Sequence, residues 1–526
     1  MGFIYQPHFP MKCLSPLRTI LVLSLLTLSI ASCESEKSSG LFADELTITA
    51  IHEAFRNGDF TAEQLVQHYL DRIASKDQPA GINSIVVINP AALEDARSLD
   101  EAFAQSGTLK PLHGIPVIVK DNYLTKGLQT TAGSISLQGF EPEVNATQVQ
   151  QLIDAGAIVL AKSNMAEWAF SPMHTESSIA GTTHNPYNTA HVPAGSSGGT
   201  AAAVASNFGA VGLGTDTGNS IRGPSSHNAL VGFRTTLGLT SRYGIVPLYL
   251  RNDVGGPMCR TVEDATRILN VIAGVDPNDS LTLYAEDKPA LDYLEFLEKD
   301  GLQGARIGVL RQLSDKDVHP EISALFEQAL QDMIAQGAVL VDPFVVRDLD
   351  SLRQDQWCAD FGSDIADFFA TFVKKEDLQS LEDIIAFGGT SEFVTGRLQR
   401  FVGQSGRWGD KSIACEDPYT DERRIAFREA LEEEMDNWEV DALVYPSWNY
   451  PPAHIDAFQE EYKGDNSQLI APHTGQPAFT VPMGFTNGGL PAGIQFLGRA
   501  FDESTLIKLV YSYEQATKHR KPPVLK

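Results

Sequence analysis

The sequence predicts an α/β protein in which helices sandwich a mixed, largely parallel central sheet. Short apolar runs rich in β-branched residues recur along the chain, as expected of buried strands. Segments with apolar residues at helical spacing separate these runs. The 526-residue chain is 43% hydrophobic and 20% charged, which is ordinary for a globular protein, and it is long enough to bury a large core.

The first half of the chain predicts helices and strands in alternation. Residues 61–64 (TAEQ) have the form of a capping box, and apolar residues follow at helical spacing. Farther on, glycines separate two helix–strand pairs, a pattern typical of parallel strands joined by helices. The predicted helices are 61–73, 148–155 and 200–208, and the predicted strands are 85–88, 117–119, 157–161 and 211–214.

The second half adds elements on either side of a charged region. The predicted strands are 306–310, 442–445 and 493–497, and the predicted helices are 322–336 and the C-terminal segment. Between about 288 and 438 the chain is charged and helix-rich, and we interpret this segment as a helical cover over the sheet. No Pro/Ser-rich linker interrupts the chain, so we expect one domain, residues 44–526, with a variable helical segment at about 290–440.

The first 32 residues predict a signal peptide of the lipoprotein type. Lys12 and Arg18 form a basic region, and residues 20–30 (ILVLSLLTLSI) form an apolar run that is too short to span a membrane. The run leads into residues 28–33 (LSIASC), which resemble the lipobox of bacterial lipoproteins.

We therefore expect lipidation of Cys33, followed by a polar tether over residues 33–43. Acyl chains on this cysteine would hold the protein on a membrane surface without a spanning helix. The expected location is the cell envelope, on the periplasmic face or the outer surface. A plain secretory signal with a chance cysteine is the alternative.

Charge and cysteine usage exclude several classes of function. The formal net charge is −27, and no basic run offsets it, so nucleic-acid binding is disfavoured. Cys259, Cys358 and Cys415 are widely spaced without a CxxC pattern, which indicates neither a disulfide framework nor a zinc site. No HExxH or EF-hand pattern occurs either, so we expect no catalytic metal and no cofactor.

Residues 194–200 (AGSSGGT) admit several interpretations. They satisfy G-x-S-x-G with Ser197 in the middle, the pattern of a nucleophile elbow. An elbow needs a strand running directly into the serine, but residues 185–193 carry turn residues instead. A P-loop would need Lys-Ser or Lys-Thr after the glycines, and a flexible spacer would not lead into an apolar helix.

Two further segments carry polar residues at predicted strand ends. Residues 114–122 (GIPVIVKDN) contain an apolar strand that ends in Lys120. Burying an unpaired ammonium at such a position is energetically unfavourable. Residues 214–224 (GTDTGNSIRGP) follow another strand and hold Ser220 in a glycine-containing turn. Taken alone, Lys120 would be expected to reach water from the strand end, and Ser220 to cap a helix.

At these three segments together the sequence closely resembles the amidase signature family. The strand lysine, the glycine–serine segment and the second serine loop match in order, and Ser196 and Ser220 are 24 residues apart, as in the family. The resemblance runs from about 46 to 516 and is weakest between about 290 and 440. It implies the amidase-signature fold.

The resemblance also implies roles for individual residues. Ser220 would be the nucleophile, Ser196, with an unusual cis peptide bond, the proton relay, and Lys120 the base. The backbone N–H groups of the turn would stabilise the oxyanion, and further residues would support the loop. The oxyanion residues are Thr217, Gly218, Asn219 and Ser220, and the supporting residues are Ser197, Asp216 and Arg222.

These roles are physically coherent. A serine hydroxyl needs a base within hydrogen-bond reach, and a lysine serves as a base only when it is neutral, which burial favours. Ser196 can accept one proton while it donates another, so it can connect Lys120 to Ser220. Many relatives carry glycine where this chain has Asn219. Asparagine tolerates positive φ better than most residues, and its side chain could narrow the acyl pocket.

The sequence therefore predicts a hydrolase that cleaves small-molecule or peptide amides through an acyl-enzyme, with the oligomeric state left open. Two rival functions remain. One is the amidotransferase subunit of a tRNA-dependent transamidation complex, a subfamily that residues 241–244 (SRYG) resemble. An export signal would separate such a protein from its tRNA. The other is a non-catalytic binding lipoprotein on the same scaffold.

Overall fold

The structure is a computed structural model that describes residues 1–2, 42, 44–406 and 414–526. The chain divides into two units, Met1–Asp44 and Glu45–Lys526. Cys33 and nearly all of the expected signal peptide and tether lie outside the described residues. In the part of the chain that is described, no helix is both long and apolar enough to cross a membrane.

The second unit is built on one mixed sheet of eleven strands, in the order β1-β3-β2-β6-β8-β7-β12-β13-β11-β9-β10. A separate pair of short strands, β4 (Glu176–Ser177) and β5 (Gly181–Thr182), lies outside this sheet. The strands of the large sheet are β1 (Ile85–Ile88), β2 (Pro116–Lys120), β3 (Ile158–Ser163), β6 (Val211–Asp216), β7 (Val231–Arg234), β8 (Val254–Cys259), β9 (Arg306–Val309), β10 (Val339–Val341), β11 (Ala442–Pro446), β12 (Ala478–Phe485) and β13 (Pro491–Leu497).

The expected α/β class and mixed sheet are confirmed, but parallel pairing is less extensive than expected. Parallel pairs join β3–β2–β6 and β11–β9–β10, while the six remaining pairings are antiparallel. The helix–strand alternation indicated the parallel pairs around β2 correctly. The strands in the middle of the sheet pair antiparallel. Antiparallel neighbours need no helix to connect them, as the short turn between β12 and β13 illustrates.

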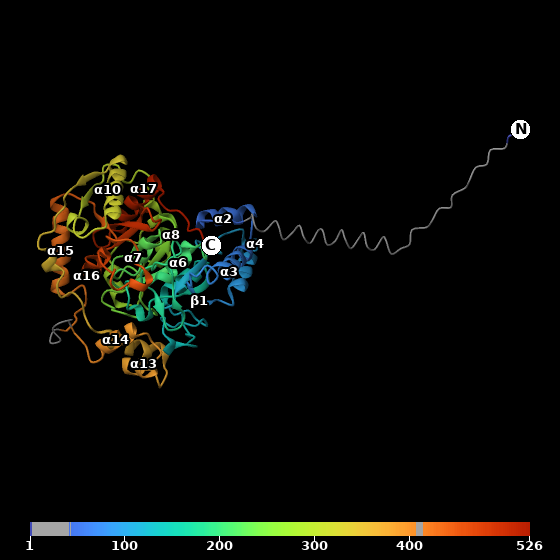
Figure 1. Ribbon diagram of the computed structural model, residues 1–526, viewed down its shortest axis with the longest axis horizontal. Coiled ribbons are helices and arrows are strands. Elements are labelled where there is room, and N and C mark those ends of the chain that lie inside the picture. The colour runs from blue at the N-terminus through green and yellow to red at the C-terminus, as the bar shows by residue number, and fades with distance from the viewer. Residues whose placement is uncertain (3–41, 43, 407–413) are drawn as a thin grey trace. The chain divides into compact units, whose positions relative to one another are not determined.

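Helices of widely varying length surround this sheet (Figure 1). The α-helices are α2 (Ile48–Asn57), α3 (Ala62–Lys76), α4 (Ala92–Ser106), α5 (Thr147–Asp154), α6 (Gly198–Ala205), α7 (Arg222–His227), α8 (Val262–Ile272), α9 (Arg311–Ser314), α10 (Pro320–Ala335), α11 (Leu349–Leu352), α12 (Phe361–Phe368), α13 (Leu381–Phe387), α14 (Glu392–Phe401), α15 (Glu422–Asn437), α16 (Ala471–Thr474) and α17 (Glu503–Thr517). A π-helical turn, Phe369–Val373, follows α12, and the short 3-10 turns are Ile135–Leu137, Glu167–Ala169, Ser280–Ala285, Tyr293–Phe296, Ile455–Ala457 and Asn466–Gln468.

The central helices pack closely on the sheet. Helix α6 contacts β2 and β6, and α7 contacts β7, β12 and β13. All eight residues of α6 (GGTAAAVA) are buried, and their small side chains allow a close approach to the strands. At Gly199 a Cβ would lie 2.1 Å from the carbonyl oxygen of Asn164, so only glycine fits there.

The charged segment between about 288 and 438 does more than cover the sheet. It supplies the strands β9 and β10, which together form one edge of the sheet. It also supplies α12, α13 and α14, of which α13 and α14 pack on each other at the bottom of Figure 1. Helix α14 carries residues that reach the cavity described below.

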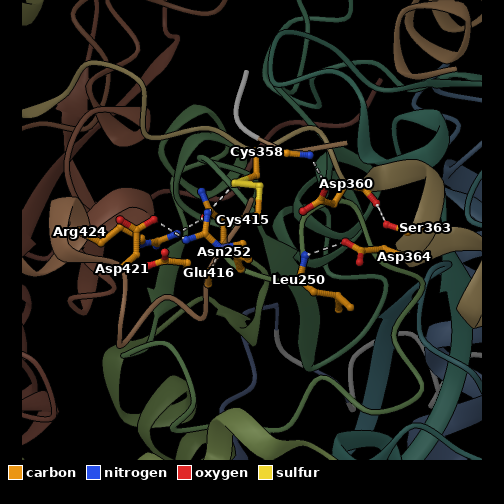
Figure 2. The surroundings of a disulfide bond; sticks show 12 residues. Leu250, Asn252, Cys358, Asp360, Ser363, Asp364, Cys415, Glu416, Asp421 and Arg424 are labelled. Atoms are coloured by element: carbon orange, nitrogen blue, oxygen red, sulfur yellow. Dashed lines mark hydrogen bonds and ion pairs between the residues drawn. A yellow bond between two sulfur atoms is a disulfide. The ribbon is translucent and has the colours of Figure 1, made fainter. Parts of the chain in front are cut away.

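The expectation that the cysteines form no disulfide is wrong for two of them. Cys358 and Cys415 are bonded, with their Cα atoms 6.1 Å apart and a sequence separation of 57 (Figure 2). Cys259 is free and buried. Sequence spacing could not reveal this pair, because the fold alone brings the two positions together. The Asp360 carboxylate lies close to both sulfurs, but bonded sulfurs are not available as thiolate ligands.

Replacing both bonded cysteines with serine is expected to lower the free energy of unfolding by about 2–4 kcal/mol, because the open chain gains conformational entropy when a loop of this length is released. Thermal unfolding measures the change. Dithiothreitol should lower the melting temperature of the parent protein but not that of the double variant. A titration of residues 34–526 in guanidinium that finds three free thiols before reduction, rather than one, would contradict the disulfide.

Candidate active site

Lys120 is the last residue of β2, which lies between β3 and β6 in the sheet. Its side chain is completely buried. The Nζ atom donates hydrogen bonds to Ser196 Oγ and Thr215 Oγ1, each at 2.7 Å. Thr215 Oγ1 also accepts a hydrogen bond from Asn122 Nδ2 at 3.0 Å. The amine is therefore enclosed by hydroxyl groups.

Burial lowers the pKa of Lys120 to about 7, against the weaker opposing effects of Asp253 and Asp216. A second buried lysine, Lys162 on the adjacent strand β3, provides a comparison. Its Nζ lies 3.6 Å from Asp121 Oδ1, and burial lowers its pKa only to about 8. Among the described residues Lys120 has no such ion pair, so it loses its proton more readily.

Ser196 lies in the irregular segment just before α6. Its side chain is fully buried, and the Gly195–Ser196 peptide bond is cis. The Ser196 carbonyl accepts a hydrogen bond from the Ala166 N–H at 3.0 Å. At Gly195 a Cβ would lie 2.4 Å from the carbonyl oxygens of His174 and Ser171, so a side chain has no room there. This packing fixes where the Ser196 hydroxyl points.

Ser197 is the N-cap residue of α6, but its hydroxyl bonds neighbouring backbone and not the helix. It donates to the Thr215 carbonyl at 3.2 Å and lies 3.3 Å from the Thr215 N–H, which donates to it. No strand runs into this serine, which rules out a nucleophile elbow here. Ser197 instead connects the start of α6 to the end of β6.

Asp216 ends β6 and organises the turn that follows. Its carboxylate accepts from Arg222 Nε at 3.0 Å, from Arg234 Nη1 at 2.9 Å and from the Ile221 N–H at 3.1 Å. Burial by itself would raise the pKa of Asp216, but the two guanidinium groups outweigh it and lower the pKa to about 2. Because all three side chains are fully buried, this cluster fixes the turn in one conformation.

The turn at 217–220 presents its backbone to a cavity of about 420 Å³. Thr217, Gly218, Asn219 and Ser220 all line this cavity. Among the described residues, none of their four backbone N–H groups donates a hydrogen bond within the protein. Free N–H groups that converge beside a serine can stabilise an oxyanion. Asn219 does not adopt positive φ, and its side chain lines the cavity.

Ser220 does not contact Ser196 directly in this structure. Its Oγ donates to Asn219 Oδ1 at 3.4 Å, and no described hydrogen bond joins it to Ser196. The structure thus places Lys120 and Ser196 together and puts Ser220 on the cavity wall. In unliganded sites, catalytic hydrogen bonds are often long and tighten when substrate binds.

Several residues of the site were missed by sequence reasoning. Arg234 ends the apolar run of β7, which is the same signal that drew attention to Lys120 and could have identified it. Thr215 stands inside the second serine segment, but nothing there marks its hydroxyl as a partner of the lysine. Asp253, which accepts a hydrogen bond from Thr217 Oγ1 at 2.5 Å, had no local signal. Trp357, on the cavity wall, lies in the variable segment.

Comparison with known sequences supports the resemblance. A family model described as Amidase matches residues 64–507. A probable amidase of Arabidopsis thaliana is 33% identical, covering 96% of each chain. A glutamyl-tRNA(Gln) amidotransferase subunit of Synechococcus sp. (strain CC9311) is 34% identical, covering 90% of this chain and 97% of its own.

Solved structures agree with the sequence comparison. The native peptide amidase from Stenotrophomonas maltophilia is 34% identical with a TM-score of 0.81, covering 92% of this chain and 99% of its own. An amidase family protein from Bacillus anthracis is 32% identical with a TM-score of 0.82, covering 93% and 94%. On these matches over nearly the whole length of the second unit, this chain belongs to the amidase signature family.

Proposed function

We propose that this chain hydrolyses carboxamides, of small molecules or of peptides, through an acyl-enzyme on Ser220. The observation that carries the proposal is the buried amine of Lys120, whose pKa is lowered to about 7 and which bonds the hydroxyl of Ser196 at 2.7 Å. A lysine in this state is available as a base at neutral pH. The serine-bearing turn with its free N–H groups lies at the end of the next strand, β6.

The proton path follows from the donors and acceptors around Lys120. Asn122 Nδ2 already occupies one lone pair of Thr215 Oγ1, and a neutral Lys120 donates to the other. The amine lone pair is then free for the Ser196 hydroxyl. When substrate binds, Ser220 turns toward Ser196, gives it a proton, and Ser196 passes its own proton to Lys120.

Attack of Ser220 Oγ on the amide carbonyl then forms a C–O bond and places negative charge on the carbonyl oxygen. The N–H groups of the turn at 217–220 stabilise that oxyanion. Removing one such donor typically lowers the rate about 10²–10³-fold. The leaving amine takes the proton back from Lys120 through Ser196. Water cleaves the acyl-enzyme by the same path in reverse.

A second candidate function is suggested by the similarity to an amidotransferase component. In that case the site would release ammonia from an amide for a partner protein. The two candidates share the chemistry and differ in the need for partners. We favour the independent amidase because an exported enzyme would be separated from tRNA.

We also propose that the protein is exported and anchored through Cys33. The lipobox-like residues 28–33 support this proposal. The Cys358–Cys415 disulfide supports export independently, since disulfides persist in oxidising compartments such as the bacterial periplasm and are rare in the cytosol.

Replacing Ser220 with alanine is expected to reduce amide hydrolysis by about 10⁴-fold or more, because the nucleophile is lost. Ser197→Ala is the matched control. It removes a hydroxyl that contacts only backbone in this site, and the expected loss is about 10-fold. Initial rates on a panel of aryl, aliphatic and peptide amides measure both. If Ser197→Ala were inactive while Ser220→Ala remained active, the assignment of Ser220 as the nucleophile would be refuted.

The pH dependence of kcat/KM is expected to report the ionisation of Lys120. At pH values below the Lys120 pKa of about 7, the amine is already protonated and cannot accept a proton. The value of kcat/KM therefore falls about tenfold per pH unit as the pH decreases, and it levels off at pH values above this pKa. Lys162→Met, which removes the other buried lysine, should leave the inflection in place. A profile that is flat from pH 5.5 to 9, or that inflects near 10, would contradict Lys120 as the base.

Cys33→Ser is expected to move the protein from the membrane fraction to the soluble fraction of the envelope, because the acyl anchor is lost. Cell fractionation and labelling with a radioactive fatty acid measure this change. Unaltered membrane attachment in this variant would overturn the anchor proposal and leave the amidase proposal untouched.

A further inference from the structure

The cavity beside Ser220 has an unusual charge distribution. Its wall is mainly apolar and aromatic, with Phe170, Tyr249, Trp357 and Phe401 among the lining residues. None of the described lining residues is an aspartate or a glutamate. Of these described residues, only Arg397 and Arg400, both from α14, bring a charged side chain to the cavity.

Neither arginine has a carboxylate partner in the part of the chain that the structure describes. Across residues 44–406 and 414–526 no ion pair or hydrogen bond is formed by the guanidinium group of Arg397 or Arg400. Other arginines near the site are paired: Arg222 with Asp216, Arg242 with Asp279 and Arg251 with Asp421. Unlike these three, the two cavity arginines have no anionic partner among the described residues, in a chain with 67 acidic and 40 basic residues.

The surroundings of Arg397 favour the binding of an anion beside it. The side chain is half-buried, and its guanidinium group lies 5.4 Å from the centre of the Phe393 ring. Burial lowers the pKa of Arg397, and the groups that raise it are two tyrosines, Tyr249 and Tyr462. Arg400 follows three positions later on the same helix, so the two like charges repel each other. A bound anion would compensate the electrostatic cost of burying the Arg397 charge and would reduce the repulsion between the two arginines.

We propose that Arg397 and Arg400 form a subsite for a carboxylate carried by the acyl part of the amide substrate. This inference rests on the proposed function, because the arginines and Ser220 line the same cavity. Guanidinium groups match the planar geometry of a carboxylate with paired hydrogen bonds. The aromatic wall contacts the carbon chain between that carboxylate and the scissile amide. The substrate class is therefore amides of dicarboxylic acids and peptide amides with an acidic group on the acyl side.

The test compares pairs of substrates that differ only in charge. Each pair consists of the monoamide of a dicarboxylic acid, from glutaramate to pimelamate, and its methyl ester at the same chain length. We expect the parent protein to show a kcat/KM at least about 10-fold higher for the acid than for the ester at the best length. The difference should lie mainly in KM, because a remote carboxylate binds equally in the ground and transition states.

The variants Arg397→Gln, Arg400→Gln and the double variant should reduce the acid-to-ester ratio toward one. Arg347→Gln is the matched control, since Arg347 is exposed and pairs with Glu434 elsewhere on the surface, and it should keep the parent ratio. A ratio near one in the parent protein, or a parent-like ratio in the double variant, would overturn the subsite.

A binding measurement separates this inference from the proposed function. Calorimetry of glutarate, adipate and pimelate with Ser220→Ala needs no turnover. Binding that disappears when Arg397→Gln is added would support the subsite even if no amide were hydrolysed. Hydrolysis of neutral amides without any binding of these diacids would support the amidase and reject the subsite.

Discussion

The structure depends on one interaction, the contact of the buried Lys120 amine with the hydroxyls of Ser196 and Thr215. An ammonium buried without a counterion is strongly disfavoured, so the site favours the neutral amine. Lys162, one strand away, illustrates the alternative, since Asp121 compensates its charge. The sheet therefore holds two buried lysines with lowered pKa values, and the one with a carboxylate 3.6 Å away keeps the higher value, about 8 against about 7.

The rest of the site keeps this amine beside a rigid serine-bearing turn. The carboxylate of Asp216 bonds Arg222 and Arg234 at the end of β6, which fixes the turn and leaves the N–H groups at 217–220 without internal partners among the described residues. Replacing one member of such a buried ion cluster leaves the others uncompensated, which typically costs about 3–5 kcal/mol. The same closeness of packing explains why Gly195 and Gly199 have no room for a side chain. The geometry of the hydroxyls thus depends on packing throughout the centre of the sheet.

Much of this could be predicted from the sequence, and the failures have physical causes. The strands β1, β2, β3, β6, β9, β11 and β13 were predicted because they are apolar runs. The strands β8 (VGGPMC) and β12 (AFTVPMGF) were missed because their glycines and prolines weaken the strand signal. Lys120 was found because it ends an apolar strand, and Arg234 carries the same signal. The Cys358–Cys415 bond and the two cavity arginines lie in the segment with the weakest family resemblance, where only the fold brings distant residues together.

The proposed chemistry requires that the amine of Lys120 is neutral at slightly alkaline pH. Selective ¹³C,¹⁵N labelling of lysine, with the Lys120 signal identified by its loss in Lys120→Met, allows its pKa to be measured directly by NMR titration. We expect one lysine that titrates near pH 7 and disappears in this variant. A Lys120 signal that stays protonated up to pH 9 would contradict the role of Lys120 as the base, because the amine would then be charged at neutral pH.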